Sequence, residues 1–348
     1  MKFSVCIPNF NYEKYLGRTL DSVLEQPVAE LEVLISDNAS TDGSREVVRG
    51  RNDPRIKMAV NPCNVGFAGN LDRAARLASG DVMIMLSSDD LMRPGALATY
   101  QRLYEALGAD ASRAVVTSSA DIIDPGDSPT GSMGPDREIW RETDLVTDLR
   151  LGPGIRIYRV EGEELLRRCL ATMKNPFNFL ATAYPRGVYE RIGGYGGGRL
   201  INPDKWFHWK LCGAGTVCYY VDAPLFAYRV HPHNQTAQQA ASGALKLLID
   251  DYASVIEVDG RLLEQLGVSR AQVEKAYVER DIARHGLAEL ARGQTIKARR
   301  ILGFGTAVYP GHALRNQKLW ALAGLCAFGS IGQKVAARLY DRKLRQEG

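Results

Sequence analysis

The sequence lacks the marks of secreted, membrane-spanning and zinc-binding proteins. The N-terminus runs directly into a strand pattern, without the apolar segment and small-residue cleavage site of a signal peptide. The largely apolar run from Leu319 to Ile331 is shorter than the roughly 20 residues that cross a bilayer. The six cysteines form no C-x-x-C pair and no zinc spacing, and most lie in apolar surroundings. We therefore expect a cytoplasmic protein whose thiols are buried and reduced.

The sequence also lacks strong charge and two nucleotide-binding signatures. A net charge of +4, with 45% hydrophobic and 24% charged residues, is typical of an ordinary globular protein. No aromatic–basic RNA-binding motif is present, so nucleic acid is not an expected partner. No G-x-G-x-x-G follows the first strand pattern, which argues against a dehydrogenase. A nucleotidyltransferase usually has a Gly-rich loop with Arg at that point, whereas residues 8–11 read Pro-Asn-Phe-Asn.

What is present is an alternation of strand and helix patterns over the first 120 residues. Short apolar runs at 3–7, 31–35, 56–60, 82–86 and 114–118 alternate with helical patterns at 13–25, 44–49, 71–78 and 95–107. This order predicts an α/β fold with a doubly wound, mostly parallel sheet. Polar clusters follow the strands, at the edge where such sheets bind ligands.

The most informative stretch runs from Asp81 to Pro94. The apolar run 82–86 is typical of a buried central strand, and it ends in Ser87-Ser88-Asp89-Asp90. Asp89 and Asp90 should therefore lie just past the carboxyl end of that strand. Carboxylates there suit Mg²⁺ or Mn²⁺ and the phosphates that such an ion bridges. An alternative for Asp90 is a cap on the helix that begins near Pro94.

The residues beyond about 120 give less detailed predictions. Residues 125–153 are rich in Gly, Pro, Ser and Asp, which predicts a long loop acting as a lid or mobile segment. Helices are expected at 162–173 and 205–211, a strand at 217–221, and mainly helices from about residue 237. The run from Leu319 to Ile331, between Lys318 and Lys334, is either a core helix or a helix lying in a membrane interface.

Six motifs occur in order along the first two thirds of the chain. They are Ile7-Pro8-Asn9-Phe10-Asn11, Ser36-Asp37-Asn38-Ala39-Ser40-Thr41-Asp42, Asn64-Val65-Gly66 with Asn70 or Asp72 beyond it, Ser87-Ser88-Asp89-Asp90, Pro203-Asp204 through Lys210-Leu211, and Tyr228-Arg229-Val230-His231. In this order the chain resembles the inverting family 2 glycosyltransferases of the GT-A fold. The resemblance implies a GT-A domain over 1–236, with a nucleotide-binding half at about 1–120 and an acceptor half at about 121–236. Residues 237–348 would then form a C-terminal helical extension.

The resemblance also assigns roles to residues. The expected donor-nucleotide contacts are Pro8, Asn9, Phe10, Asn11, Asp37, Asn38, Asn64, Asn70, Ser88, Asp90 and Arg229. Asp89 and His231 are the expected metal ligands, for Mg²⁺ or Mn²⁺, and Asp204 is the expected catalytic base. Alternatives remain open from the residues alone: a turn or cap for Asp37, a structural histidine at His231, and a helix N-cap at Asp204.

The chain departs from the family pattern at two positions. Ser87 stands where the family has the first aspartate of its metal motif, and Pro203 where it has a glutamate. The expected function is transfer of a sugar from a UDP- or dTDP-sugar, with a guanine donor left open, to a glycan or lipid-linked acceptor with inversion. It would serve cell-surface polysaccharide synthesis at the inner face of the membrane. The alternatives are a non-catalytic nucleotide-sugar-binding protein, which Ser87 favours, and a nucleotidyltransferase.

Overall fold

The chain divides into two compact units, seen here in a computed structural model that describes residues 1–196, 200, 203–234 and 244–347. The first, called the α/β unit, comprises Met1–Cys169 and Asn175–Asn234. The second, called the helical unit, comprises Leu170–Lys174 and Gln235–Gly348. The domain boundary expected after residue 236 lies outside the described residues.

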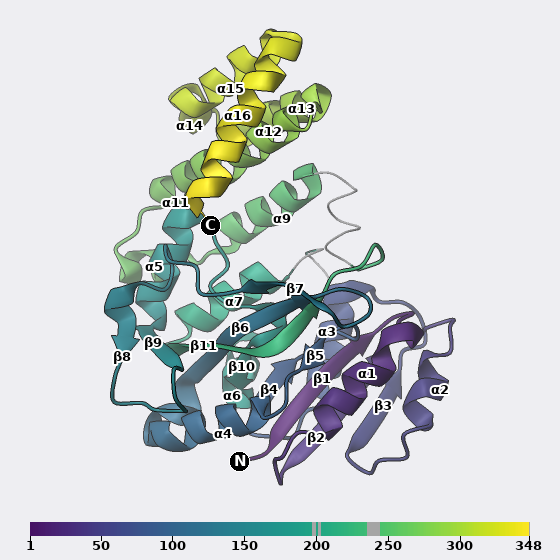
Figure 1. Ribbon diagram of the computed structural model, residues 1–348. Coiled ribbons are helices and arrows are strands. Elements are labelled where there is room, and N and C mark those ends of the chain that lie inside the picture. Colours follow the sequence, from purple (N-terminus) through teal and green to yellow (C-terminus); the bar gives the residue numbers. More distant parts are fainter. Residues whose placement is uncertain (197–199, 201–202, 235–243, 348) are drawn as a thin grey trace. The chain divides into compact units, whose positions relative to one another are not determined.

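The first half of the α/β unit is a parallel sheet with strand order β3-β2-β1-β4 (Figure 1). Its strands are β1 (Phe3–Asn9), β2 (Leu31–Asp37), β3 (Ile56–Val60) and β4 (Val82–Met85), connected by α1 (Glu13–Leu24), α2 (Ser44–Arg49) and α3 (Gly66–Arg76). Every residue of β1, β2 and β4 is buried, as expected for central parallel strands covered on both faces. The chain reverses its direction of winding between β1 and β4, and open sheets bind ligands at such a switch point.

Beyond β4 the sheet becomes mixed. It continues in the order β10-β6-β11-β9-β8, with β5 paired to β11 and β7 to β6. The elements are β5 (Leu91–Met92), α4 (Ala96–Leu107), β6 (Ala114–Ile123), β7 (Pro129–Met133), β8 (Leu145–Val146), β9 (Arg156–Glu161), α5 (Gly162–Thr172), β10 (Ala183–Pro185), α6 (Arg186–Ile192), α7 (Asp204–Gly213) and β11 (Val217–Arg229). The expected α/β fold is confirmed, with β10 antiparallel to both its neighbours.

The predicted loop at 125–153 was wrong in part, because it contains β7 and β8. Both strands are short, and β7 is largely exposed, so neither has the apolar pattern of a buried strand. β11 is longer than the predicted 217–221 and reaches Arg229, with a register shift around Pro224 that keeps it paired with β6. This extension carries Tyr228 and Arg229 of the last motif to the edge of the sheet where β4 ends.

The helical unit contains α9 (Ala244–Glu257), α10 (Gly260–Leu266), α11 (Arg270–Ala276), a π-helical turn (Tyr277–Ile282), α12 (Ala283–Ala291), α13 (Thr295–Val308), α14 (Pro310–Leu314), α15 (Gln317–Ala327) and α16 (Gly329–Glu347). Its core gathers Leu290, Ala298, Leu322, Cys326 and Ala336. The core interpretation of 319–331 holds in part, since Leu322 is buried while Phe328 is exposed, and the membrane-interface interpretation stays a prediction. Among the described residues, no helix has the length and apolar character needed to cross a membrane.

Candidate functional site

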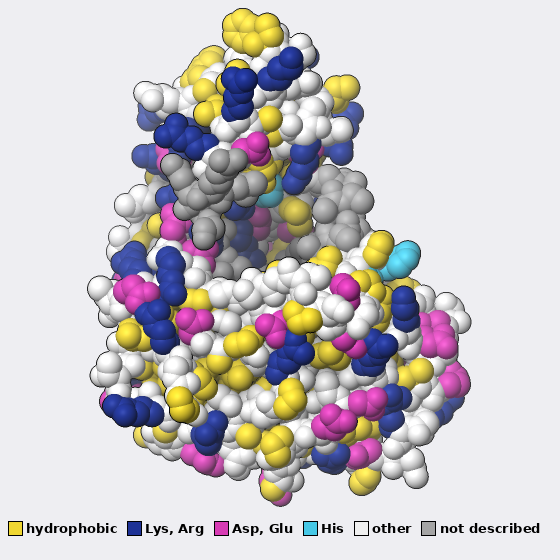
Figure 2. Space-filling model, in the orientation of Figure 1, with side chains coloured by type: hydrophobic (Ala, Val, Ile, Leu, Met, Phe, Trp, Pro, Cys, Tyr) yellow, Lys and Arg dark blue, Asp and Glu magenta, His cyan; other side chains and the backbone are white. Residues whose placement is uncertain are grey.

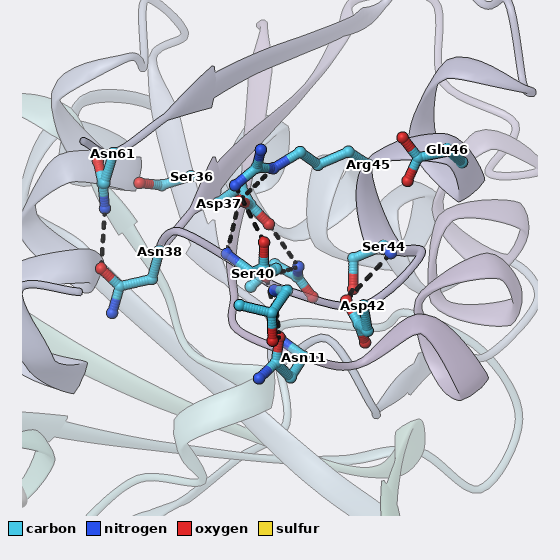
Figure 3. Close-up of polar contacts among 12 residues, drawn as sticks. Asn11, Ser36, Asp37, Asn38, Ser40, Asp42, Ser44, Arg45, Glu46 and Asn61 are labelled. Carbon is cyan, nitrogen blue, oxygen red and sulfur yellow. Dashed lines mark hydrogen bonds and ion pairs between the residues drawn. The ribbon is translucent and has the colours of Figure 1, made fainter. Parts of the chain in front are cut away.

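Asp37 lies at the carboxyl end of β2, opposite Asn9 of β1. It is 1% exposed. Asn9 Nδ2 donates to Oδ2 (3.0 Å), while Arg45 Nε and the Ser40 backbone N donate to Oδ1 (3.0 Å each) (Figure 3). Burial raises the pKa of Asp37, but the hydrogen bonds from Ser40, Asn9 and Arg45 outweigh burial and hold the pKa below its ordinary value. Asp37 is therefore an ionised, fixed acceptor, and its bond from Ser40 is the turn contact of the alternative interpretation.

A network of amide side chains joins the ends of β2 and β3 to the start of α3. Asn38 Oδ1 accepts from Asn61 Nδ2 (3.1 Å), and Asn38 Nδ2 donates to Asn64 Oδ1 (2.9 Å). Asn70 Oδ1 accepts from Asn61 Nδ2 (3.0 Å) and from Ser36 Oγ (2.7 Å). The structure thus brings the predicted Asn38, Asn64 and Asn70 together. It adds Asn61, whose position directly after a strand was the signal that could have found it.

The loop after β1 is held to the end of β4. Ser88 Oγ donates to the Pro8 carbonyl (2.7 Å), which ties the two strands at the switch point. Asn11 has a left-handed backbone (φ 59°), and its Oδ1 accepts from the Thr41 backbone N (2.8 Å). Between these fixed residues, Phe10 is 41% exposed. A large aromatic ring beside buried polar groups is suited to stacking on a nucleotide base.

The acidic pair after β4 is bonded to the end of β11. The Asp89 Oδ2 lies 3.0 Å from His231 Nε2, and Asp90 Oδ1 accepts from the Arg229 backbone N (2.9 Å). Burial and the charge of Asp89 raise the pKa of Asp90, against the effect of its hydrogen bonds. The cap interpretation of Asp90 is wrong, because Gly95 occupies the N-cap position of α4 and makes no side-chain bond.

Arg229 is a fully buried cation that organises this cluster. Its guanidinium donates to the carbonyls of Asp89 (2.7 Å) and Asp124 (3.2 Å), pairs with the Asp127 carboxylate, and lies 5.0 Å from the centre of the Tyr15 ring. One nitrogen, Nη2, is buried with no hydrogen-bond partner among the described residues. The sequence did not indicate Asp127, because the contact depends on the fold of the loop after β6.

Asp89 and His231 meet part of the geometry of a cation site. Two neighbouring ligands of one ion, each about 2.1 Å away and at right angles, lie roughly 3.0 Å apart. The His233 backbone N points at His231 Nδ1 (3.3 Å), so Nε2 carries the proton that faces Asp89. That proton must leave Nε2 before His231 binds a metal. Within the described ranges, no three His, Cys, Asp or Glu side chains gather as a metal group.

Asp204 is the first residue of α7 and is half-buried. The structure places Pro203, not Asp204, at the N-cap position, so the cap interpretation is wrong. Asn175 Nδ2 donates to Asp204 Oδ2 (3.3 Å), and Asn175 Oδ1 lies 2.7 Å from His208 Nδ1. Burial lowers the pKa of His208 to about 3, so the ring is neutral and its Nδ1–H donates to Asn175. No sequence pattern pointed to Asn175, which donates to the Asp204 carboxylate.

A doubly wound sheet with buried carboxylates at its switch point is the architecture of α/β proteins whose ligands bind at the carboxyl ends of the strands. Residues 4–174, about half of the chain, match the model of glycosyl transferase family 2, so this part of the chain belongs to that family. A Campylobacter jejuni GalNAc(5)-diNAcBac-PP-undecaprenol beta-1,3-glucosyltransferase is 35% identical over 101 residues, which is 28% of this chain and 33% of that protein. The chain matches only between 14% and 39% of the length of its first curated relatives.

Solved structures share the fold along nearly the whole chain. Staphylococcus aureus TarS 1–349 in complex with UDP-GlcNAc has a TM-score of 0.59 at 17% sequence identity, covering 99% of this chain and 92% of that one. A mannosyltransferase from Pyrobaculum calidifontis in complex with GDP-Man and Mn²⁺ has a TM-score of 0.50 at 19% identity, covering 98% and 87%. At these identities the likeness shows the fold alone.

Proposed function

We propose that this protein transfers a sugar from a UDP- or dTDP-sugar to a hydroxyl group of a glycan or lipid-linked acceptor, with inversion. One observation carries the proposal. The Asp37 carboxylate stands at the carboxyl end of β2 and the Asp89–His231 pair just past the carboxyl end of β4, so the two flank β1 on opposite sides of the switch point. That arrangement would bind the nucleobase of the donor on one side of the switch point and its diphosphate on the other. Residues 1–120 would bind the donor, and residues 121–236 the acceptor.

The donor base would lie beside Asp37. A pyrimidine such as uracil or thymine presents an imide N–H, and the ionised Asp37 is an acceptor for it. Asn9 Oδ1 is a second acceptor there, since it is buried with no partner among the described residues. Phe10 would stack on the base, with Pro8 and Asn11 holding its loop. Asn38, Asn64 and Asn70 would keep this edge rigid, because Asn38 bonds to Asn64 and Asn61 bonds to both Asn38 and Asn70.

The diphosphate would lie near Asp89, Asp90 and Arg229. The Nη2 of Arg229 has no hydrogen-bond partner in the described part of the chain, and it is a cationic donor suited to a phosphate oxygen. Ser88 and Asp90 would hold the strand end in place. Mg²⁺ or Mn²⁺, held by Asp89 and His231, would neutralise the charge that develops on the leaving diphosphate. Because Ser87 stands in place of a carboxylate, Asp89 and His231 are the two expected protein ligands among the described residues, and oxygens of donor and water would fill the remaining positions.

Asp204 would act as the general base. It takes the proton of the acceptor hydroxyl while that oxygen forms a bond to the anomeric carbon. The bond from this carbon to the diphosphate breaks, and the nucleoside diphosphate leaves. A single displacement with one carboxylate yields the inverted anomer. The hydrogen bond from Asn175 to Oδ2 would orient the Asp204 carboxylate toward the acceptor hydroxyl.

The acceptor and location follow from chemistry and from relatives. The Campylobacter relative is named for a sugar chain on undecaprenyl diphosphate, a lipid-linked acceptor. We extend that acceptor class to this chain, with glycan synthesis at the cytoplasmic face of the membrane. The family match favours glycosyl transfer over nucleotidyl transfer.

A thermal-shift screen against UDP, dTDP and GDP, each with and without Mn²⁺, tests the donor assignment. A nucleotide at 100 times its dissociation constant should stabilise the protein by about 2.7 kcal/mol. UDP or dTDP with Mn²⁺ should give the largest shift, and a GDP-only shift would contradict the proposal. Hydrolysis of a nucleotide-sugar panel with Mn²⁺ separates the enzyme from a non-catalytic binder, the second candidate that Ser87 favours.

A further inference from the structure

The helical unit has a long segment without acidic residues. No Asp or Glu occurs between Glu289 and Asp341. The same segment contains eight cationic residues: Arg292, Lys297, Arg299, Arg300, Arg315, Lys318, Lys334 and Arg338. The chain as a whole is nearly balanced, with 44 basic and 40 acidic residues. The positive charge is therefore concentrated on one part of the molecule, where it has no acidic neighbours in sequence.

This segment also exposes large apolar side chains. Half of those exposed among the described residues fall within it: Ile296, Leu314, Trp320, Phe328, Ile331, Val335 and Leu339. Phe328 is 70% exposed, Ile331 68% and Trp320 61%. Figure 2 shows hydrophobic and Lys or Arg side chains side by side on this unit. Soluble monomers rarely expose such side chains in clusters, so the surface has the character of a binding site.

Helix α16 arranges the two kinds of residue in parallel stripes. Ile331, Val335 and Leu339 recur every four residues and share one face. Lys334, Arg338 and Arg342 recur with the same spacing, shifted by three residues, so they flank that apolar stripe. The other side of the helix packs inward: Gly332 and Ala336 are buried, and Ala336 belongs to the core of the unit. The exposed stripes therefore lie outside the core of the unit.

Two exposed aromatic side chains, Trp320 and Phe328, lie near α16 in the sequence, and Trp320 is amphipathic. Trp320 Nε1 donates to the Leu314 carbonyl (2.9 Å), which leaves the apolar body of the ring open to solvent. Phe328 lies directly after α15, in the connection to α16. Aromatic rings beside cationic side chains are typical of helices that lie at a bilayer surface.

We propose that Trp320, Phe328 and the exposed stripes of α16, together called the apolar–basic surface, dock on an anionic lipid bilayer. The apolar residues enter the headgroup boundary, and Lys318, Lys334, Arg338 and Arg342 meet lipid phosphates. A second copy of the chain is a poorer occupant. A symmetric contact would set cation against cation, because Lys334, Arg338 and Arg342 outnumber Asp341 on this part of α16. This docking stands independently of the donor chemistry.

Vesicle co-sedimentation tests the proposal with the full chain. Vesicles of phosphatidylcholine with phosphatidylglycerol should bind the protein, and phosphatidylcholine alone should bind it weakly. Each cation near an anionic surface strengthens binding by roughly fivefold, so Lys334→Gln, Arg338→Gln and Arg342→Gln together should weaken it roughly 100-fold. Arg338→Lys with Arg342→Lys is the matched control, because it keeps the charge and should bind as the parent does.

A second readout reports the apolar contact. Trp320 is the one tryptophan among the largely exposed hydrophobic residues described, so brominated lipids should quench its fluorescence. Quenching should disappear in Trp320→Phe, and Phe328→Ser should weaken binding with its melting temperature retained. UDP-induced thermal shifts without vesicles should be unchanged in all variants, which separates this proposal from the donor assignment. Equal binding to both vesicle types, no binding, or self-association abolished by Phe328→Ser would each overturn it.

Discussion

Replacement of Asp204 by asparagine gives the sharpest test of the proposed mechanism. The asparagine has the same shape, and its Oδ1 can still accept from Asn175 Nδ2, which lies 3.3 Å from the carboxylate. What the variant loses is the ability to take a proton. It also loses a negative charge in the first turn of α7, which is worth about 0.3–1 kcal/mol of folding stability. The fold should therefore survive with a small drop in melting temperature.

The kinetic effect should be much larger than the effect on stability. General-base catalysis typically contributes about 100- to 10,000-fold, so turnover of Asp204→Asn should fall by a factor in that range. Donor affinity should not change, because the contacts of Asp37 and Arg229 do not involve Asp204. The wild-type product should be the inverted anomer, since one displacement leaves no covalent intermediate.

Three measurements decide the matter: turnover, donor affinity by calorimetry, and product anomer by NMR. Glu190→Gln is the matched control, because it changes one exposed carboxylate on α6, paired with Arg186, and should keep full turnover. Asn175→Ala should lower turnover by less than Asp204→Asn, since it removes the bonds to Asp204 and His208 but keeps the carboxylate that takes the proton. Wild-type turnover in Asp204→Asn would remove Asp204 from the mechanism, and a retained anomer would refute single displacement.

Three further predictions address the donor site and the fold. Asp37→Ala should weaken nucleotide binding by about 1.5–3 kcal/mol in calorimetry, with Asp53→Ala as the control; unchanged affinity would leave Asp37 a turn residue. Asp89→Ala should abolish metal-dependent nucleotide binding with the fold intact, and full activity of that variant in EDTA would refute the metal assignment. Burial raises the pKa of the Glu32 carboxyl, but hydrogen bonds from Ser4, Ser79, Lys2 and Lys57 lower that pKa by more. The ionised carboxylate therefore stabilises the folded protein above about pH 4.5. This stabilisation is lost as the pH falls through the lower pKa of the folded state. Glu32→Gln should then cost about 2 kcal/mol at pH 7 by chemical denaturation and flatten the acid decline; an unchanged acid limb would contradict this.

Regular elements of the nucleotide half could be predicted from sequence because their signals are local. The apolar runs of β1 and β2 and the helical spacing of Leu16 and Leu20 report burial directly. β3 and α2 occur with the predicted bounds. The strands of the second half are different, since β10 has three residues and pairs with strands far along the chain. Three residues are too few to show the two-residue alternation by which a strand is recognised.

Some residues of the candidate site could likewise be predicted from the sequence, and others could not. Motif residues such as Asp37 and Asp89 could be named because each follows a strand whose end the sequence marks. Their partners could not, since contacts between Arg229 and Asp127 or between Asn175 and Asp204 join segments that only the fold brings together. The pairing of Asp89 with His231 was expected only through resemblance. The hydrogen bond from His233 that fixes the ring proton had no sequence signal.

The way the chain passes between its two units bears on how the gene can be divided. Residues 170–174 belong to the helical unit, while Asn175 opens the return to the α/β unit. A reading frame that stops after Asn234 would encode every strand of the sheet, yet would leave this short insert without the unit it belongs to. Recombination that exchanges the helical unit between related genes would therefore need two crossover regions. The base-orienting Asn175 stands at the edge of one of them.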